Sequence, residues 1–321
     1  MEIERFGVAR FSHDNSMIQF YTGFMSLSML YAFFNYIKPA ACSMTSYYYK
    51  AADSVNVNMG RQRNMLIIGE LFLFLCRLKC GLMEQDLAVR FNVHISTVSR
   101  KIITWANFMY FILGSISIWP SREKIDENMP VMFRTLYPNT RIVIDCTEIK
   151  TEKPSSLALG SKCYSTYKSS YTWKGLVGVA PHGALIFVSS LYTGSMSDVE
   201  ITQLCGLVDL LQIGDSIMAD KGFVLNKVLD GTGVAVNTPP FLMSQGQFSK
   251  QQVEETQTIA KLRIHVERHI RHVRRVKEYH LFDGIIPLSM TGTINQLWTV
   301  ANMLTLFRGP LVKEWQINSL T

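Results

Sequence analysis

The sequence lacks the cysteine spacing of a zinc site or of a secreted disulfide framework. It holds six cysteines in 321 residues, and none of them forms a CxxC pair or stands near a pair of histidines. It also has no internal repeat and no low-complexity tract. We therefore expect free, mostly buried thiols in a reducing compartment.

Acidic residues are outnumbered by basic ones. The chain has 25 Asp and Glu against 32 Lys and Arg, which gives a formal net charge of +7 and a pI near 9.0. This balance favours polyanionic partners such as nucleic acid, although charge alone is not specific. With 48% hydrophobic and 18% charged residues, the chain is globular and long enough for one large or two ordinary domains.

Charge is absent from one long apolar stretch, residues 17–37, which is long enough to span a bilayer. That stretch carries several polar side chains, and the preceding MEIERFGVAR does not resemble the start of a signal peptide. We interpret the stretch as a buried packing helix, with a membrane span as the alternative.

The remaining sequence separates into a helical part and a mixed part. From 64 to 113, apolar residues recur at three- and four-residue steps, a pattern typical of helices. Further along, β-branched runs predict strands, and PHGA with Gly183 predicts a turn between two of them. The expected elements are strands at 141–149, 173–180 and 184–192, a helix at 197–211 with Ser197 and Glu200 as a capping box, strands at 216–220 and 234–237 with a short helix between them, and a helix at 249–278. This order predicts a mixed α/β sheet with flanking helices.

Two acids lie near strand ends of this predicted sheet. Asp145 is inside the apolar run IVIDCTEI, where an unpaired carboxylate is costly, and Asp220 ends the run SIMAD. Strand ends at topological switch points are where sites form in open α/β sheets. Asp198 has another explanation because the first turn of a helix favours a carboxylate, and strand alternation aims Glu148 at the face opposite Asp145. The alternative is that Asp145 and Asp220 cap strands or turns.

A third acid, Glu267, lies in the basic helical segment KLRIHVERHIRHVRRVK. Three carboxylates brought together would repel one another unless cations were bound, and hard oxygen ligands select Mg²⁺ or Mn²⁺. Two such ions activate water or a 3′-hydroxyl and stabilise the leaving oxygen in phosphodiester chemistry. Arg263, Arg271 and Arg274 flank Glu267 and would hold a phosphate backbone. The alternative is a solvated helix face on which Glu267 pairs with Arg271.

These residues, in this order, resemble the DDE transposases of the Harbinger (PIF) group and the related insertion-sequence transposases that share the RNase H-like fold. The similar stretches cover most of residues 137–270 and are YPNTRIVIDCTEIKTEKPS, YKSSYTWKGLVGVAPHGALIFVSSLYTGSMSD, GDSIMADKGF, VNTPPF and VEETQTIAKLRIHVERHI. The resemblance implies an RNase H-like nuclease whose catalytic, metal-binding triad is Asp145, Asp220 and Glu267.

Upstream, LMEQDLAVRFNVHISTVSRKIITWA is similar to the helix-turn-helix that precedes the nuclease in this family. Asn92 to His94 would make the turn, and Ser96 would cap the second helix. The residues expected to face the core are Leu87, Ala88, Phe91, Val98 and Ile102. The residues left exposed for a groove or for phosphates are Thr97, Ser99, Arg100 and Lys101. Taken without the nuclease sequence that follows, such a helix pair would as readily have a purely structural role in packing the core.

The resulting expectation is a nuclear, Mg²⁺-dependent (or Mn²⁺-dependent) DNA endonuclease and transposase. The expected regions are an N-terminal helical framework at 1–60, a helix-turn-helix at 61–115 and an RNase H-like nuclease domain at 136–310. DNA is the expected partner. Members of the family often rely on a separate Myb-like DNA-binding protein, so such a partner is possible here. The chain could also form a homo-oligomer. No membrane partner is expected. The alternative from another class is a domesticated, catalytically silent DNA-binding or scaffold protein.

Overall fold

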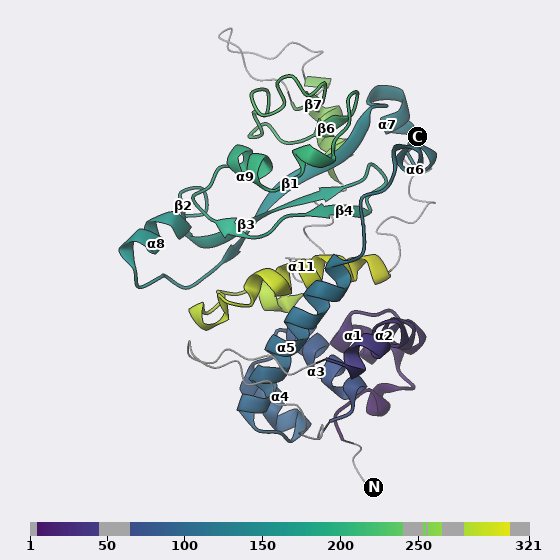
Figure 1. The fold of residues 1–321 in the computed structure, drawn as a ribbon, viewed down its shortest axis with the longest axis vertical. Coiled ribbons are helices and arrows are strands. Elements are labelled where there is room, and N and C mark those ends of the chain that lie inside the picture. Colours follow the sequence, from purple (N-terminus) through teal and green to yellow (C-terminus); the bar gives the residue numbers. More distant parts are fainter. Residues whose placement is uncertain (1–4, 45–64, 240–252, 255, 265–278, 309–321) are drawn as a thin grey trace. The chain divides into compact units, whose positions relative to one another are not determined.

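The chain divides into two compact units in a computed structural model (Figure 1), and each is described by itself. The structure describes residues 5–44, 65–239, 253–254, 256–264 and 279–308. The first unit comprises 1–116 and 273–309, and the second comprises 117–272 and 310–321.

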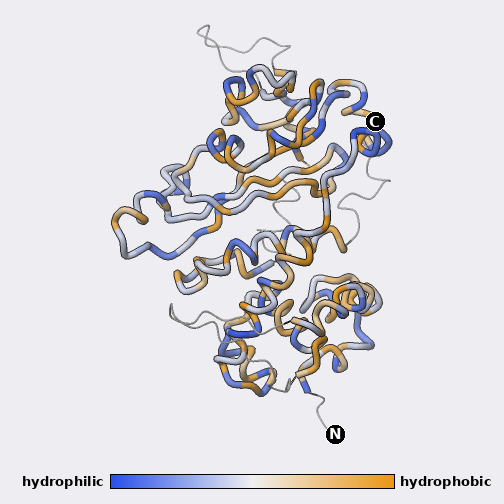
Figure 2. Tube along the Cα trace, viewed as in Figure 1, coloured by the Kyte–Doolittle hydropathy of each residue, from blue (hydrophilic) through white to orange (hydrophobic). Residues whose placement is uncertain are grey.

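The first unit is helical, and hydrophobic and hydrophilic residues alternate along its helices (Figure 2). The central helix α3 is buried along most of its length and packs against α1, α2, α4 and α5. The α-helices are α1 (Asn15–Thr22), α2 (Leu27–Cys42), α3 (Ile67–Cys80), α4 (Glu84–Phe91), α5 (Ile95–Gly114) and α11 (Ile294–Leu304). The short 3₁₀ helices are η1 (Ala9–Phe11), η3 (His280–Phe282), η4 (Leu288–Met290) and η5 (Thr305–Arg308).

The uncharged stretch 17–37 was predicted as one helix, and the structure corrects this to two. Helix α1 ends at Gly23, whose φ of 82° is left-handed, and Ser26 then caps α2. The chain therefore bends where glycine makes a positive φ inexpensive. Among the described residues no single helix is long and apolar enough to cross a bilayer, although α1 and α2 together, bent by 49°, meet the criteria of length and composition.

The second unit is built on a mixed sheet, as predicted. The strand order is β2-β3-β1-β6-β7, and β4 and β5 also pair with β3. Strand β1 is antiparallel to β3 and parallel to β6, which is parallel to β7. The strands are β1 (Thr140–Lys150), β2 (Tyr164–Ser165), β3 (Ser170–Val179), β4 (Leu185–Val188), β5 (Tyr192–Thr193), β6 (Ser216–Met218) and β7 (Ala235–Asn237). Together with the flanking helices, this sheet confirms the α/β, RNase H-like fold class.

Helices flank the sheet, and side chains from most of them join its core. The helices are α6 (Arg122–Glu127), α7 (Val131–Leu136), α8 (Leu157–Cys163), α9 (Asp198–Leu204), the 3₁₀ helix η2 (Val208–Leu210) and a helix that includes residues 256–264. Ile142 and Ile144 of β1, Ile217 of β6, and Ile259 and Leu262 of the last helix belong to one buried cluster. This cluster fixes the last helix against the sheet.

Several predicted boundaries were wrong. The helix expected at 197–211 ends at Leu204 because Gly206 takes a φ of 78°, and η2 follows it. The strand expected at 184–192 is two strands, β4 and β5, and the chain between β6 and β7 forms turns in place of a short helix. Helices α6, α7 and α8 were not predicted because each has only six or seven residues.

Gly178 leaves no room for a side chain at the centre of the sheet. A Cβ there would lie 2.2 Å from Ile142 Cδ1 and 3.2 Å from Phe187 Cβ. We predict that Gly178→Ala lowers the free energy of unfolding by about 1–3 kcal/mol through overpacking. Ile142→Val removes the clashing methyl group and should restore part of the loss in denaturant titrations. A double variant no more stable than Gly178→Ala would contradict this packing.

Candidate functional site

Asp145 and Asp220 lie next to each other on neighbouring parallel strands. Val143 of β1 pairs with Met218 of β6, and each acid stands two residues beyond that pair. Asp145 is half-buried within β1, whereas Asp220 is exposed in the turn that follows β6. The sequence thus brings two carboxylates together at the carboxyl end of β6, beside the middle of β1.

Arg263 binds both carboxylates. Its Nη1 lies 3.2 Å from Asp220 Oδ1, and its Nη2 lies 3.8 Å from Asp145 Oδ1. Its side chain is only 8% exposed, and its Nε has no hydrogen-bond partner among the described residues. We expected this arginine on a DNA-facing helix surface; the structure corrects that placement, because burial beside two acids makes it their counterion. Its contact with DNA stays a prediction.

Burial makes the charged form of Asp145 costly. The pKa of the Asp145 carboxyl is raised to about 6, chiefly because burial removes hydration; Arg263 opposes this shift, and the negative charge of Asp220 adds to it. The backbone N–H of Cys146 donates a hydrogen bond of 2.9 Å to Asp145 Oδ1. The carboxylate therefore depends on a nearby cation to stay ionised at neutral pH.

The third predicted acid, Glu267, lies outside the described residues, as do Arg271 and Arg274. Within the part of the chain that the structure describes, no group of three or more His, Cys, Asp or Glu side chains is placed to hold a metal ion. The described part of the site therefore consists of Asp145, Asp220 and the guanidinium of Arg263. The triad as a whole stays a prediction.

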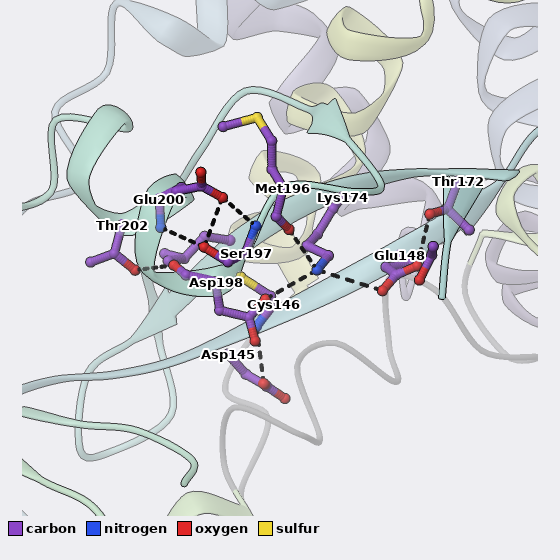
Figure 3. A network of polar contacts seen from close by, with 12 residues as sticks. Asp145, Cys146, Glu148, Thr172, Lys174, Met196, Ser197, Asp198, Glu200 and Thr202 are labelled. Carbon is purple, nitrogen blue, oxygen red and sulfur yellow. Dashed lines mark hydrogen bonds and ion pairs between the residues drawn. The ribbon is translucent and has the colours of Figure 1, made fainter. Parts of the chain in front are cut away.

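The opposite face of β1 carries a second polar network (Figure 3). Lys174 Nζ donates to the Met196 carbonyl at 2.9 Å and lies 3.3 Å from Asp198 Oδ1 and 3.7 Å from Glu148 Oε1. The Thr172 hydroxyl donates to Glu148 Oε2 at 2.7 Å. Glu148 is thus held away from Asp145, in agreement with the alternation prediction.

Asp198 interacts with residues on both faces of β1. It opens α9, where the predicted capping box between Ser197 and Glu200 is present. Its side chain binds Lys174, and its negative charge also raises the pKa of Asp145. Sequence reasoning missed Lys174; its place opposite Glu148 in the β1–β3 register was the signal that could have found it.

The helix pair α4 and α5 has the predicted turn between its helices. Asn92 adopts a left-handed φ of 51° and ends α4. The N-cap of α5 is His94, whose Nδ1 accepts from the Ser96 backbone N–H at 3.2 Å, which corrects the prediction of Ser96. The predicted core residues Leu87, Ala88, Val98 and Ile102 are buried, and Phe91 is half-buried.

Of the four α5 residues predicted to face DNA, only Arg100 is exposed; Thr97, Ser99 and Lys101 are half-buried. The Lys101 ammonium forms an ion pair with Glu70, a fully buried residue of α3. The Trp105 indole N–H donates to the other Glu70 oxygen at 3.1 Å. Because a buried carboxylate needs such partners, Lys101 stabilises the helical unit, and its DNA contact stays a prediction.

Comparison with known families agrees with this architecture. Residues 144–305 match the family model described as DDE superfamily endonuclease. Residues 64–115 match the model described as helix-turn-helix of DDE superfamily endonuclease. The first match spans half of the chain, so the protein belongs to the DDE superfamily of endonucleases. A search of the curated proteins found no match.

Lys101→Met should leave the Glu70 carboxylate buried without its cation. We predict a loss of about 3–5 kcal/mol in the free energy of unfolding, measured by denaturant titration. Glu70→Gln combined with Lys101→Met removes both charges and should recover much of that loss. An equally large loss in the double variant would show that the ion pair is not the cause.

Asp145→Asn should stabilise the protein at neutral pH in metal-free buffer. The folded-state pKa of about 6 exceeds the unfolded value, so the folded state binds more protons and wild-type stability falls as pH rises from about 4 to 6. Asn avoids this loss, which amounts to about 3 kcal/mol at pH 7. The advantage should shrink below pH 6 in thermal unfolding series. An advantage that is independent of pH, or a less stable variant at pH 7, would contradict the burial argument.

Proposed function

We propose that this protein is a metal-dependent DNA endonuclease and transposase of the Harbinger (PIF) type that cuts and joins DNA. One observation carries the proposal: Asp145 of β1 and Asp220, just beyond the end of the parallel strand β6, both bind the guanidinium of Arg263. Carboxylates gathered at a strand end without cations would repel each other. The match to DDE superfamily endonucleases supports the same chemistry.

The donor set fits a hard divalent cation. Carboxylate oxygens are the ligands that Mg²⁺ and Mn²⁺ prefer, and the guanidinium between the two acids shows that a positive charge is stable there. Asp145, Asp220 and Glu267 would hold the metal ions. In a two-metal site such ions activate the attacking oxygen and stabilise the leaving oxygen of a phosphodiester.

The side chains divide the remaining work. Asp145, half-buried in β1, pairs with Val177 of β3, and this pairing fixes the backbone that carries its carboxylate. Asp220, in the exposed turn, faces the side from which DNA would approach. Arg263 neutralises both acids while no other cation is present, and its release from them would free a guanidinium for a DNA phosphate.

The helix-turn-helix supplies a second DNA contact in this proposal. The exposed Arg100 is the strongest candidate, with Thr97 and Ser99 beside it on α5. The arginines at 271 and 274 would continue the phosphate contacts near the acids. A nuclear location, a Myb-like partner protein, a homo-oligomer and the boundaries 1–60, 61–115 and 136–310 belong to the same proposal.

Asp220→Asn should abolish Mg²⁺-dependent cleavage of a DNA end while leaving DNA binding intact or tighter. The change keeps the size of the side chain but removes a negative charge from a cation site, so DNA phosphates are repelled less. Losing several kcal/mol of transition-state stabilisation means a rate loss on the order of a thousandfold. Cleavage and electrophoretic binding assays on the same DNA measure both effects.

Two matched variants sharpen this test. Asp230→Asn changes an exposed acid of the same unit and should cleave like the wild type. If Asp198→Asn abolishes cleavage and Asp220→Asn does not, the second carboxylate has been assigned to the wrong residue. If the wild type cleaves no faster than Asp220→Asn, the catalytically silent DNA-binding protein becomes the better account.

A further inference from the structure

A projecting arm, defined here as residues 151–169, extends from the sheet that carries the acids. Strand β1 continues five residues beyond Asp145 to Lys150, and the chain then passes through α8 and β2 before it returns as β3. Figure 1 shows α8 and β2 at the end of the sheet away from α6 and α7. The arm therefore lies beyond the far end of β1, on the side of the sheet toward which the strand runs from Asp145.

The solvent-facing surface of the arm is basic. Lys153, Lys162 and Lys168 are exposed, and Glu152 is the one acid of the arm sequence. Lys150, the last residue of β1, is also exposed and adds a further positive charge where the arm begins. This concentration of positive charge favours a polyanion.

The same surface exposes aromatic and aliphatic side chains that a monomeric fold would normally cover. Tyr167 is 82% exposed, Leu157 is 88% exposed and Tyr164 is 39% exposed. The Lys168 ammonium lies 4.4 Å from the centroid of the Tyr167 ring. Figure 2 shows hydrophilic and hydrophobic residues side by side along this part of the chain. An exposed ring next to an ammonium is suited to stacking on a base while the lysine holds a phosphate.

The arm is attached to the sheet by several specific contacts. The Ser195 N–H donates to the Lys162 carbonyl at 3.0 Å, and the rings of Tyr164 and Tyr171 meet edge to face at 5.4 Å. A Cβ at Gly194 would lie 2.8 Å from the Cys163 carbonyl oxygen, so the β5 segment approaches the arm too closely for any side chain. The exposed lysines and Tyr167 are thus presented from a packed element.

We propose that the arm is a DNA-binding surface in which Lys162 and Lys168 bind backbone phosphates and Tyr167 stacks on a base. This inference rests on the proposed endonuclease function and extends it to a part of the chain with no assigned role. Five strand residues from Asp145 to Lys150 span about 17 Å. That length corresponds to about five base-pair steps of DNA, so one duplex can reach both the acids and the arm.

A second copy of this chain is the competing occupant of the arm. A symmetric dimer places the same patch of both copies face to face, so the lysines of one arm would lie against those of the other. Like charges brought together in this way oppose association, whereas the same lysines attract phosphates. The charge of the arm therefore favours DNA.

The test compares two double variants that lose the same charge. Lys162→Gln with Lys168→Gln changes the arm, and Lys124→Gln with Lys227→Gln changes two exposed lysines elsewhere in the same unit. Fluorescence anisotropy with a random-sequence duplex of three helical turns, repeated over a range of salt, gives the affinity and its salt slope. In the arm variant, the slope of log K against log[salt] should become smaller in magnitude by about 1.8. Its affinity near 0.1 M salt should fall about tenfold or more. The matched control should retain both.

Tyr167→Ala should weaken binding to a duplex with a single-stranded end about tenfold while leaving the salt slope unchanged, because stacking releases no counterions. Thermal unfolding of every variant checks that the arm is still folded. Equal slopes and affinities in the two double variants would overturn the proposal. A changed oligomeric state in sedimentation, with unchanged DNA affinity, would overturn it in favour of a dimer surface.

The wild type separates failure of this proposal from failure of the proposed function. A wild type that cleaves DNA with Mg²⁺, beside an arm variant that matches its control, would overturn the arm proposal alone. A wild type that neither binds nor cleaves DNA would overturn the endonuclease function and the arm proposal together.

Discussion

A half-buried carboxylate beside a second acid is the constraint on which the candidate site depends. The parallel pairing of β1 and β6 brings Asp145 and Asp220 to one place, and the half-buried position of Asp145 makes its negative charge costly. A cation has to offset both effects. In the described structure Arg263 supplies it, from a helix whose residues Ile259 and Leu262 are packed into the sheet core. The last helix and the sheet are thus coupled by hydrophobic packing and by charge.

The other side of β1 shows how the same strand is kept in place. Lys174 contacts Glu148, Asp198 and the carbonyl of Met196, so that β1, β3 and the start of α9 share one half-buried ammonium. A charged group partly removed from water needs polar partners, and this ammonium donates hydrogen bonds to Met196 and Asp198 and forms an ion pair with Glu148. The two faces of β1 therefore have different tasks: one fixes the strand, and the other presents a carboxylate. The protein's membership of the DDE superfamily of endonucleases gives the second task its chemical meaning.

Much of the fold was predictable because its signals are local. The run IVIDCTEI, the capping box at Ser197 and the turn at Gly183 each correspond to observed elements. The partners of charged residues were not predictable in the same way, because they depend on tertiary contacts. Lys101 was predicted to contact DNA, but its ammonium pairs with the buried carboxylate of Glu70, which is thirty-one residues away in sequence. Arg263 was predicted to lie on the exposed face of its helix, but it is buried, as is its neighbour in sequence, Leu262. Short elements such as α6 to α8 carry too few residues to show a periodicity.

The central claim is that Asp145 and Asp220 form a cation site that Arg263 occupies only until a metal ion binds. A crystal structure of the protein with Mn²⁺ and a DNA end, analysed by anomalous scattering, tests this most directly. The account predicts a manganese peak between the two carboxylates, with the Arg263 guanidinium displaced toward a DNA phosphate. Manganese bound elsewhere, with Arg263 still bridging Asp145 and Asp220, would contradict it.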